Sequence, residues 1–254
     1  MISRYCHTSP SRFLLRSGLH TSLFEHARVL ALCFATLTAI VVGGHPALAN
    51  EDTPQRIGVM LFDGVLTSDV VAPLEVFGVA IENEIIEGYE IITIAPEAGL
   101  VTTHEGLTLQ ADFGIEDAPD LDVIIVGSRY DMDPVLDDQD FMAFVTKQAA
   151  QADWIASNCS GAYVLAATGL LNGVNVTTYP GGEVWLKLNH PRVRIDIDAT
   201  VVVDQNVVTS NGSLVSYAAA IELLKNIVGP EQSQEAADTI YFTRLLERHG
   251  LSNS

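Results

Sequence analysis

The chain is poor in positive charge. It carries 13 Lys and Arg residues against 32 Asp and Glu residues over 254 positions, a formal net charge of −19. Because a phosphate backbone is bound through a basic surface, this composition argues against a nucleic-acid partner. Charged residues make up 18% of the chain and apolar residues 48%, which excludes an intrinsically disordered protein.

Cysteine is also scarce, with one residue each at positions 6, 33 and 159. No CxxC and no HxxxH pattern occurs, which removes the usual zinc-site and thioredoxin-like interpretations. The sequence therefore predicts no metal and no cofactor.

The first 49 residues have the three parts of a secretory signal. Residues 1–28 contain four arginines and one acid, residues 29–44 carry no charge, and Ala47-Leu48-Ala49 forms a small-residue cleavage site. The apolar run of 16 residues is short for crossing about 30 Å of hydrocarbon. We therefore expect cleavage after Ala49 and an exported protein, periplasmic or secreted, with no stable membrane insertion. An uncleaved anchor and an organelle transit peptide are the alternatives.

Cleavage would leave residues 50–254 as a single domain. Four basic residues and one acid leave with the signal, so nine basic and 31 acidic residues remain, a formal charge of −22. Cys159 is then the only cysteine and has no partner for an internal disulfide. A lone cysteine is either a small buried apolar residue or a reactive thiol.

Apolar segments of strand length alternate with helical patterns along this domain. The segments typical of strands are residues 56–62, 89–95, 107–113, 121–127, 154–158, 174–179 and a pair within 194–210. The segments typical of helices are residues 69–82, 135–151, 160–171, 214–229 and 231–250. This alternation predicts an α/β fold with a mostly parallel sheet covered by helices on both faces.

The segment around Cys159 carries the strongest chemical signal. Ligands of such sheets bind at the carboxyl ends of the strands, and the strand expected at 154–158 runs directly into this cysteine. The helix begins at once with Ser160 and Gly161, small residues that permit a sharp strand-to-helix turn, called a nucleophile elbow. Free N–H groups and the dipole at a helix N-terminus favour a thiolate. We therefore predict a nucleophilic Cys159 with a lowered pKa.

Two other strand ends contribute candidate site residues. Asp69 lies in the first turn of the expected 69–82 helix, where an acid is favoured in any case. If it faces the sulfur, its pKa rises and it can act as a general acid. Backbone N–H groups of Gly127 and Ser128, with those of Ser160 and Gly161, are candidates for an oxyanion hole or a substrate-binding loop.

Arg129 is next in that loop and is one of nine basic residues after position 49. It either binds an anionic group of a ligand or pairs with Asp131 or Asp133. Exposed ion pairs of this kind are common and contribute little to stability, and we expect the pairing.

Four segments together resemble one family, the ThiJ/PfpI superfamily, over about residues 56–245. They are IGVMLFDGVLTSDVVAPLEVF (57–77), DVIIVGS (122–128), SNCSGAYVLAATGLLNGVNVTTYP (157–180) and VVVDQNVVTSNGSLVSYAAAIELL (201–224). The resemblance implies a flavodoxin-like three-layer sandwich with a nucleophile elbow, and a homodimer. With an aspartate at position 69, the segment SDVVAPLEVF resembles the branch of the superfamily that contains isonitrile hydratases. In those enzymes the nucleophile falls on Cys159, the assisting acid on Asp69 and a hydroxyl residue, usually Thr, on Ser160.

Two departures from the family pattern narrow the activity. Protease-like and amidotransferase-like members place a histidine after a Thr-Thr pair, whereas Tyr179 follows Thr177-Thr178 here. None of the three histidines after position 49 stands there (His104, His190 and His249). This argues against peptidase and amidase activities, which need such a base. The loop beginning at Gly127 reads GSRYDMDP and lacks the glycine pair of the family.

The sequence thus predicts a cysteine-dependent hydratase of the isonitrile hydratase type. It would act on a small electrophilic molecule through a covalent thioimidate at Cys159. One alternative is a glyoxalase-like or deglycase-like enzyme, in which the same thiolate adds to a reactive aldehyde. Another is a non-catalytic exported module for binding or redox sensing, whose thiol oxidises reversibly to sulfenic acid.

Overall fold

The computed structural model describes residues 53–250. The predicted signal segment, residues 1–49, lies outside the described residues, so cleavage after Ala49 and export stay predictions. No helix within residues 53–250 has both the length and the apolar character needed to cross a bilayer.

Seven strands form the central sheet, in the order β10-β11-β7-β6-β1-β2-β5. Their bounds are β1 Gln55–Met60, β2 Tyr89–Ala95, β5 Phe113–Gly114, β6 Val123–Val126, β7 Trp154–Asn158, β10 Val201–Asp204 and β11 Val207–Ser210. Every neighbouring pair is parallel except β10 and β11, which form an antiparallel hairpin. The carboxyl ends of β1, β6, β7 and β11 therefore meet at one edge of the sheet.

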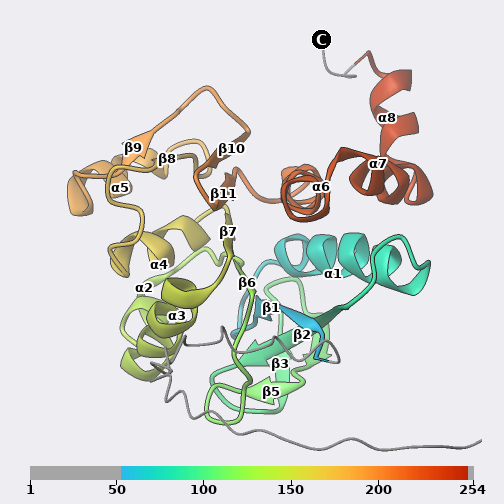
Figure 1. The fold of residues 1–254 in the computed structure, drawn as a ribbon. Helices are drawn as coiled ribbons and strands as arrows, with labels where there is room; N and C mark the ends of the chain where they lie inside the picture. Colours follow the sequence, from blue (N-terminus) through green and yellow to red (C-terminus); the bar gives the residue numbers. More distant parts are fainter. Residues whose placement is uncertain (1–52, 251–254) are drawn as a thin grey trace, which may run out of the picture. The chain divides into compact units, whose positions relative to one another are not determined.

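Helices cover both faces of this sheet (Figure 1). One face carries α1 Thr67–Glu82, α6 Val215–Val228 and α7 Pro230–Thr239, and the other carries α2 Asp133–Leu136, α3 Gln139–Gln151 and α4 Gly161–Ala167. All four residues of β6 are buried, as a strand covered on both faces requires. The predicted α/β sandwich with a mostly parallel sheet is confirmed.

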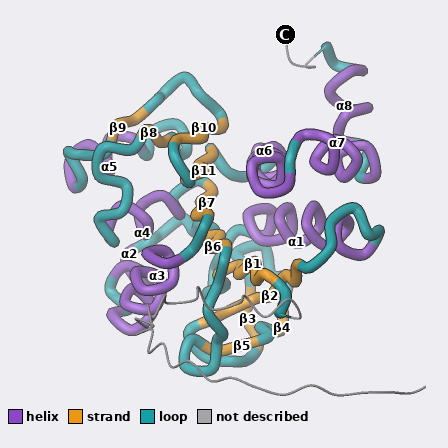
Figure 2. The backbone as a smooth tube through the Cα atoms, viewed as in Figure 1, coloured by secondary structure: helices purple, strands orange, loops and turns teal. Residues whose placement is uncertain are grey.

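Two small sheets flank the main one. Strands β3 Leu100–Thr102 and β4 Thr108–Gln110 form an antiparallel hairpin. Strands β8 Asn175–Val176 and β9 Arg194–Ile195 pair in parallel and, with α5 Glu183–Asn189, form a lobe on the α4 side of the sheet (Figure 2).

Two expected strand segments are divided. The segment 107–113 becomes β4 and β5, because Asp112 accepts hydrogen bonds from the backbone and side chain of Thr93 and draws the chain onto β2. Within 194–210 only the β10–β11 hairpin is a pair, since β9 joins β8 instead. The strand expected over 174–179 shortens to β8.

Two expected helices are also divided. The segment 135–151 becomes α2 and α3, since the Asp138 side chain accepts from the N–H of Phe141 and caps a new helix. The segment 231–250 becomes α7 and α8 Phe242–Arg248, separated where Tyr241 adopts a φ of 61°. The helix expected over 160–171 ends at Ala167, ahead of Gly169 with a φ of 82°.

Gly161 lets the start of α4 pass against the end of β6, which gives a first prediction. A Cβ at this position would lie 2.4 Å from the carbonyl oxygen of Val126 and 2.6 Å from that of Gly127. Because backbone atoms would have to move, Gly161→Ala should lower the free energy of unfolding by about 1–3 kcal/mol. Urea unfolding measures this.

Gly78→Ala is the matched control, since a Cβ there meets nothing within 4 Å. It should be neutral or stabilise α1 by up to about 1 kcal/mol. Equal unfolding free energies for the two variants would contradict the close approach at the elbow.

Candidate active site

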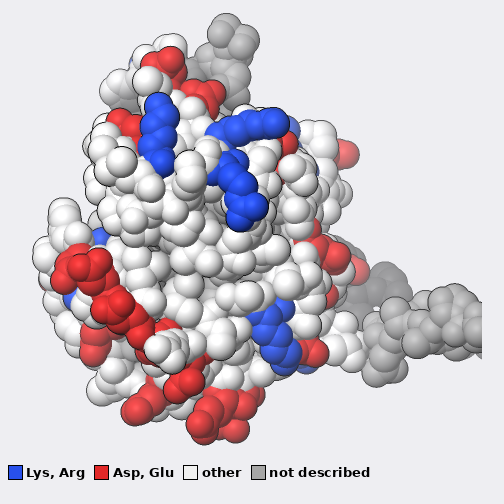
Figure 3. All heavy atoms as spheres, turned by 90° about the vertical axis from the view of Figure 1, so that its left-hand side faces the viewer, with Lys and Arg blue, Asp and Glu red and all other residues white. Residues whose placement is uncertain are grey.

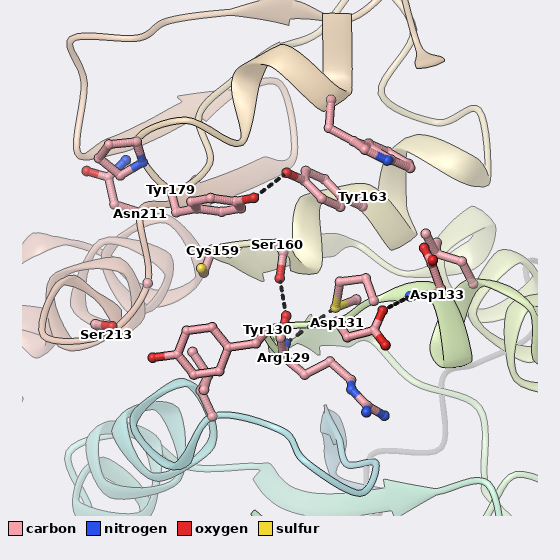
Figure 4. Close-up of a pocket in the computed structure, with 16 residues that line it drawn as sticks. Arg129, Tyr130, Asp131, Asp133, Cys159, Ser160, Tyr163, Tyr179, Asn211 and Ser213 are labelled. Carbon is pink, nitrogen blue, oxygen red and sulfur yellow. Dashed lines mark hydrogen bonds between the residues drawn. The ribbon is translucent and has the colours of Figure 1, made fainter. Parts of the chain in front are cut away.

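Cys159 stands between β7 and α4 with a φ of 53°, a conformation rare for residues other than glycine. Its N–H donates to the carbonyl of Ser210 at 2.9 Å, and its carbonyl accepts from Thr178 Oγ1 at 2.7 Å. Left-handed backbone of this kind costs on the order of 1–3 kcal/mol and persists only where the surroundings hold it. The predicted elbow is present, with the sulfur at its tip (Figure 4).

A pocket of about 590 Å³ opens over Cys159 and Ser160. Its wall is largely aromatic, from Tyr130, Tyr163, Tyr179 and Trp185. The rings of Tyr163 and Trp185 stack with centroids 4.1 Å apart, and the hydroxyls of Tyr163 and Tyr179 lie 3.0 Å apart (Figure 4). Burial raises the pKa of Tyr163, so its phenol is neutral. This wall offers flat apolar surface to a ligand substituent.

Asp69 lies beneath the pocket with no exposed surface. Its Oδ1 accepts from the N–H of Ser213 at 2.9 Å and from Ser216 Oγ at 2.7 Å, and its Oδ2 accepts from Ser128 Oγ at 2.5 Å. Burial raises the pKa of Asp69, and these hydrogen bonds oppose the shift without cancelling it. The raised pKa agrees with the sequence prediction, but its cause is burial.

The buried hydroxyl of Ser128 donates to the carboxyl group of Asp69, and it also acts to lower the pKa of Cys159. Ser160, the residue after the cysteine, acts on the pKa of Cys159 in the same direction. The hydroxyl of Ser160 donates to the carbonyl of Arg129 at 3.0 Å (Figure 4). The structure therefore brings Cys159 and Asp69 together beside Gly212, with Ser160 next to the cysteine at the start of α4.

The pKa of Cys159 is raised, whereas the sequence predicted that it would be lowered. Burial of the sulfur is the largest cause, and the Asp69 carboxylate adds to it. Hydrogen bonds from Ser128 and Ser160 act in the opposite direction and are outweighed. The resting group at neutral pH is a thiol, so a base must remove its proton during any nucleophilic reaction.

Three of the residues predicted to form an oxyanion hole, Gly127, Ser128 and Gly161, do not line the pocket over Cys159. Gly127 packs closely, since a Cβ there would lie 3.0 Å from Val65 Cγ2. Substrate binding by these three residues stays a prediction.

Arg129 does not form the expected ion pair. Its guanidinium donates to the carbonyl of Asp63 at 3.0 Å and points away from Cys159, and no salt bridge within residues 53–250 joins it to Asp131 or Asp133 (Figure 4). The two aspartates form the acidic rim of the pocket, which Arg129 also lines, so the charged side chains of the lining sum to a net charge of −1.

Basic groups lie elsewhere on this side of the molecule. Figure 3 shows a group of basic side chains in the upper half of one face and a further one in its lower half, while acidic side chains gather toward the lower left and also lie near the top and the right edge. One segment of eight residues, from α5 to β9, holds three of the basic residues after position 49: Lys187, Arg192 and Arg194. No group of three or more His, Cys, Asp or Glu side chains in the described range is placed to hold a metal ion.

The sequence analysis missed the residues that hold Asp69 in place. Asn158 donates to the backbone carbonyl of Asp69 at 3.2 Å and accepts from Ser210 Oγ at 2.6 Å. Gly212, with a φ of 78°, leaves room between Cys159 and Asp69. A Cβ at this position would lie 2.4 Å from Cys159 Cβ and 3.2 Å from Asp69 Oδ1. The available signal was the run Ser210-Asn211-Gly212-Ser213 at the end of a strand beside β7.

Comparison with known proteins agrees with this architecture. The model of the DJ-1/PfpI family matches residues 55–226, and the chain belongs to that family. Isonitrile hydratase of Pseudomonas putida is 30% identical over 179 residues, covering 70% of this chain and 75% of that enzyme. The HTH-type transcriptional regulator GbdR of Pseudomonas aeruginosa is 25% identical and covers 77% of this chain, which spans about half of the regulator's length.

Solved structures share the fold. A ThiJ/PfpI family protein from Pseudomonas syringae superposes with a TM-score of 0.65 at 21% identity, over 80% of this chain and 84% of the other. DJ-1beta of Drosophila melanogaster gives 0.63 at 21% identity, over 74% of this chain and 98% of the other. The membership in the family is thereby established, while the hydratase branch and a homodimer stay predictions.

The carboxylate beside the sulfur gives a prediction for thiol titration. Asp69→Asn removes a negative charge that raises the pKa of Cys159. The alkaline midpoint in the rate of alkylation by iodoacetamide should therefore move to lower pH. An unchanged or higher midpoint in a folded variant would show that the Asp69 charge does not act on the thiol.

Proposed function

We propose that the protein is a cysteine-dependent hydratase that converts a small isonitrile to the N-substituted formamide. The observation that carries the proposal is the closeness of Cys159, which lines an aromatic pocket, to the buried carboxyl group of Asp69: a Cβ on Gly212 would lie 2.4 Å from Cys159 Cβ and 3.2 Å from Asp69 Oδ1. The two groups supply a nucleophile and a proton donor without a histidine. No histidine is among the described residues that line this pocket.

The reaction balances with these groups alone. The Cys159 thiolate adds to the terminal carbon of the isonitrile. The proton held by the carboxyl group of Asp69 passes to that carbon, which yields a thioimidate. Water then adds across the carbon–nitrogen double bond. The thiolate leaves as the carbonyl forms, which releases the formamide and restores the free thiol system.

The similarity to isonitrile hydratase supports the choice of substrate class. The match covers a larger share of the hydratase than of the regulator. The part of this chain that matches the family model, residues 55–226, contains both Cys159 and Asp69. The raised pKa of Cys159 argues against the redox-sensing alternative, because oxidation to sulfenic acid follows thiolate character.

Turnover of an aryl or alkyl isonitrile by the purified protein tests the proposal. Cys159→Ala should abolish formamide production, and Asp69→Asn should lower kcat by about 10² or more if the acid transfers the proton. Gas chromatography of the formamide measures both. Full activity in Cys159→Ala would eliminate covalent catalysis.

The same preparation is offered methylglyoxal in a parallel assay. Cysteine-dependent loss of methylglyoxal with no turnover of isonitriles would replace the hydratase proposal with the glyoxalase-like alternative.

The acidic rim gives a prediction for substrate charge. With Asp131 and Asp133 on the rim and the Arg129 guanidinium turned away, an isonitrile bearing a carboxylate should have a kcat/KM at least about threefold below that of a neutral analogue. High salt should bring the kcat/KM values of the anionic and the neutral analogue closer together, because it screens the repulsion between charges. An anionic analogue that is preferred at low salt would contradict the role of this rim.

A further inference from the structure

We propose that the pocket over Cys159 selects a substrate whose aromatic substituent carries a hydrogen-bond donor, and that the hydroxyl oxygen of Tyr179 accepts from this donor. Tyr179 is then a specificity-determining residue. The inference rests on the proposed function for the isonitrile group that bears this substituent. The selection itself is a matter of binding, so it can be measured without turnover.

The hydrogen bonds of the aromatic wall run in one direction. The Tyr163 hydroxyl lies 3.0 Å from the carbonyl oxygen of Gly182 and 3.0 Å from the Tyr179 hydroxyl (Figure 4). A hydroxyl has a single proton, and a carbonyl oxygen can only accept. The proton of Tyr163 therefore lies toward Gly182, and the proton of Tyr179 lies toward Tyr163.

This order leaves Tyr179 with only lone pairs to offer to a ligand. Its side chain lines the pocket, and no second hydrogen bond to its hydroxyl is present within residues 53–250. Tyr163 is buried, so its own proton has no acceptor in bulk solvent to turn to. A ligand group that meets the Tyr179 oxygen must therefore donate.

Two other polar side chains of the lining have their protons bound in the same way. The Ser160 hydroxyl donates to the carbonyl of Arg129 at 3.0 Å. The Asn211 amide nitrogen donates to the carbonyl of Thr178 at 2.6 Å. Each side chain keeps an oxygen that can only accept. The polar lining next to Cys159 is therefore a set of acceptors.

The remaining polar side chains of the lining do not offset this preference. Asp131 and Asp133 accept as carboxylates, and the guanidinium of Arg129 is turned away from the sulfur (Figure 4). The hydroxyls of Tyr130 and Ser213 belong to exposed side chains and can donate or accept, so they select neither kind of ligand.

The aromatic wall accounts for the ring of the substituent. Tyr163 and Trp185 stack on one another, and Tyr130 and Tyr179 complete the wall of a pocket of about 590 Å³. Contacts between aromatic rings contribute beyond the area that they bury. A phenol meets both requirements, because its ring packs on the wall and its O–H donates to Tyr179.

Binding of aryl formamides, the products of the proposed reaction, tests the inference by isothermal titration calorimetry. The 3- and 4-hydroxyphenyl formamides carry a ring donor, and the corresponding fluorophenyl compounds are close in size and carry none. At least one hydroxy compound should bind about threefold or more tightly than its fluoro counterpart. In Tyr179→Phe, which keeps the ring and removes the oxygen, this ratio should fall to about one, with the affinity of the fluoro compound unchanged.

Tyr217→Phe is the matched control. The Tyr217 hydroxyl donates to Glu75 at 2.5 Å and is not part of the pocket lining, so this variant should keep the wild-type ratio. A ratio near one in the wild-type protein would overturn the inference. So would a preference that survives in Tyr179→Phe, an equal loss of preference in Tyr217→Phe, or no binding of any of these formamides at millimolar concentration.

The two proposals fail separately. A preference that depends on Tyr179, in a protein that does not turn over isonitriles, would overturn only the proposed function. Turnover of isonitriles without this preference would overturn only the role of Tyr179.

Discussion

The buried carboxyl group of Asp69 is the constraint on which the site depends. Groups from five segments hydrogen bond this residue: the loop after β6, the end of β7, the loop after β11, the start of α6 and α1 itself, with Asn158 acting on its backbone. A buried carboxyl group without such partners would cost several kcal/mol. Satisfying it fixes the spacing of four strand ends at once, and the position of the sulfur follows from that spacing.

Burial and the nearness of the Asp69 carboxylate also explain why the pKa of Cys159 is raised and not lowered. The usual view of a cysteine at a helix N-terminus is a thiolate stabilised by the dipole. Helix α4 has only seven residues, and the effects of a dry setting and a nearby carboxylate exceed its contribution.

The sequence predicted the layer arrangement and the elbow at Cys159 because these depend on local pattern. Alternating apolar segments define the sheet, and the small residues after Cys159 define the elbow. It could not predict the cradle of Asp69, because Ser128, Ser213 and Ser216 converge only through the parallel pairing of β6, β7 and β11. The predicted direction of the Cys159 pKa shift was wrong for the same reason, since burial is a property of the assembled layers. The divided helices at Asp138 and Tyr241 depend on single caps that periodicity does not register.

The close passage of Gly161 over the end of β6 has a consequence for divergence among relatives. The position of Cys159 is set by main-chain contacts between a strand and a helix, whereas the aromatic wall is built from side chains of α4, of α5 and of two loops. Wall residues can therefore be exchanged without displacing the sulfur. One scaffold can in this way acquire new substrate preferences by drift at its periphery while the attacking atom keeps its trajectory.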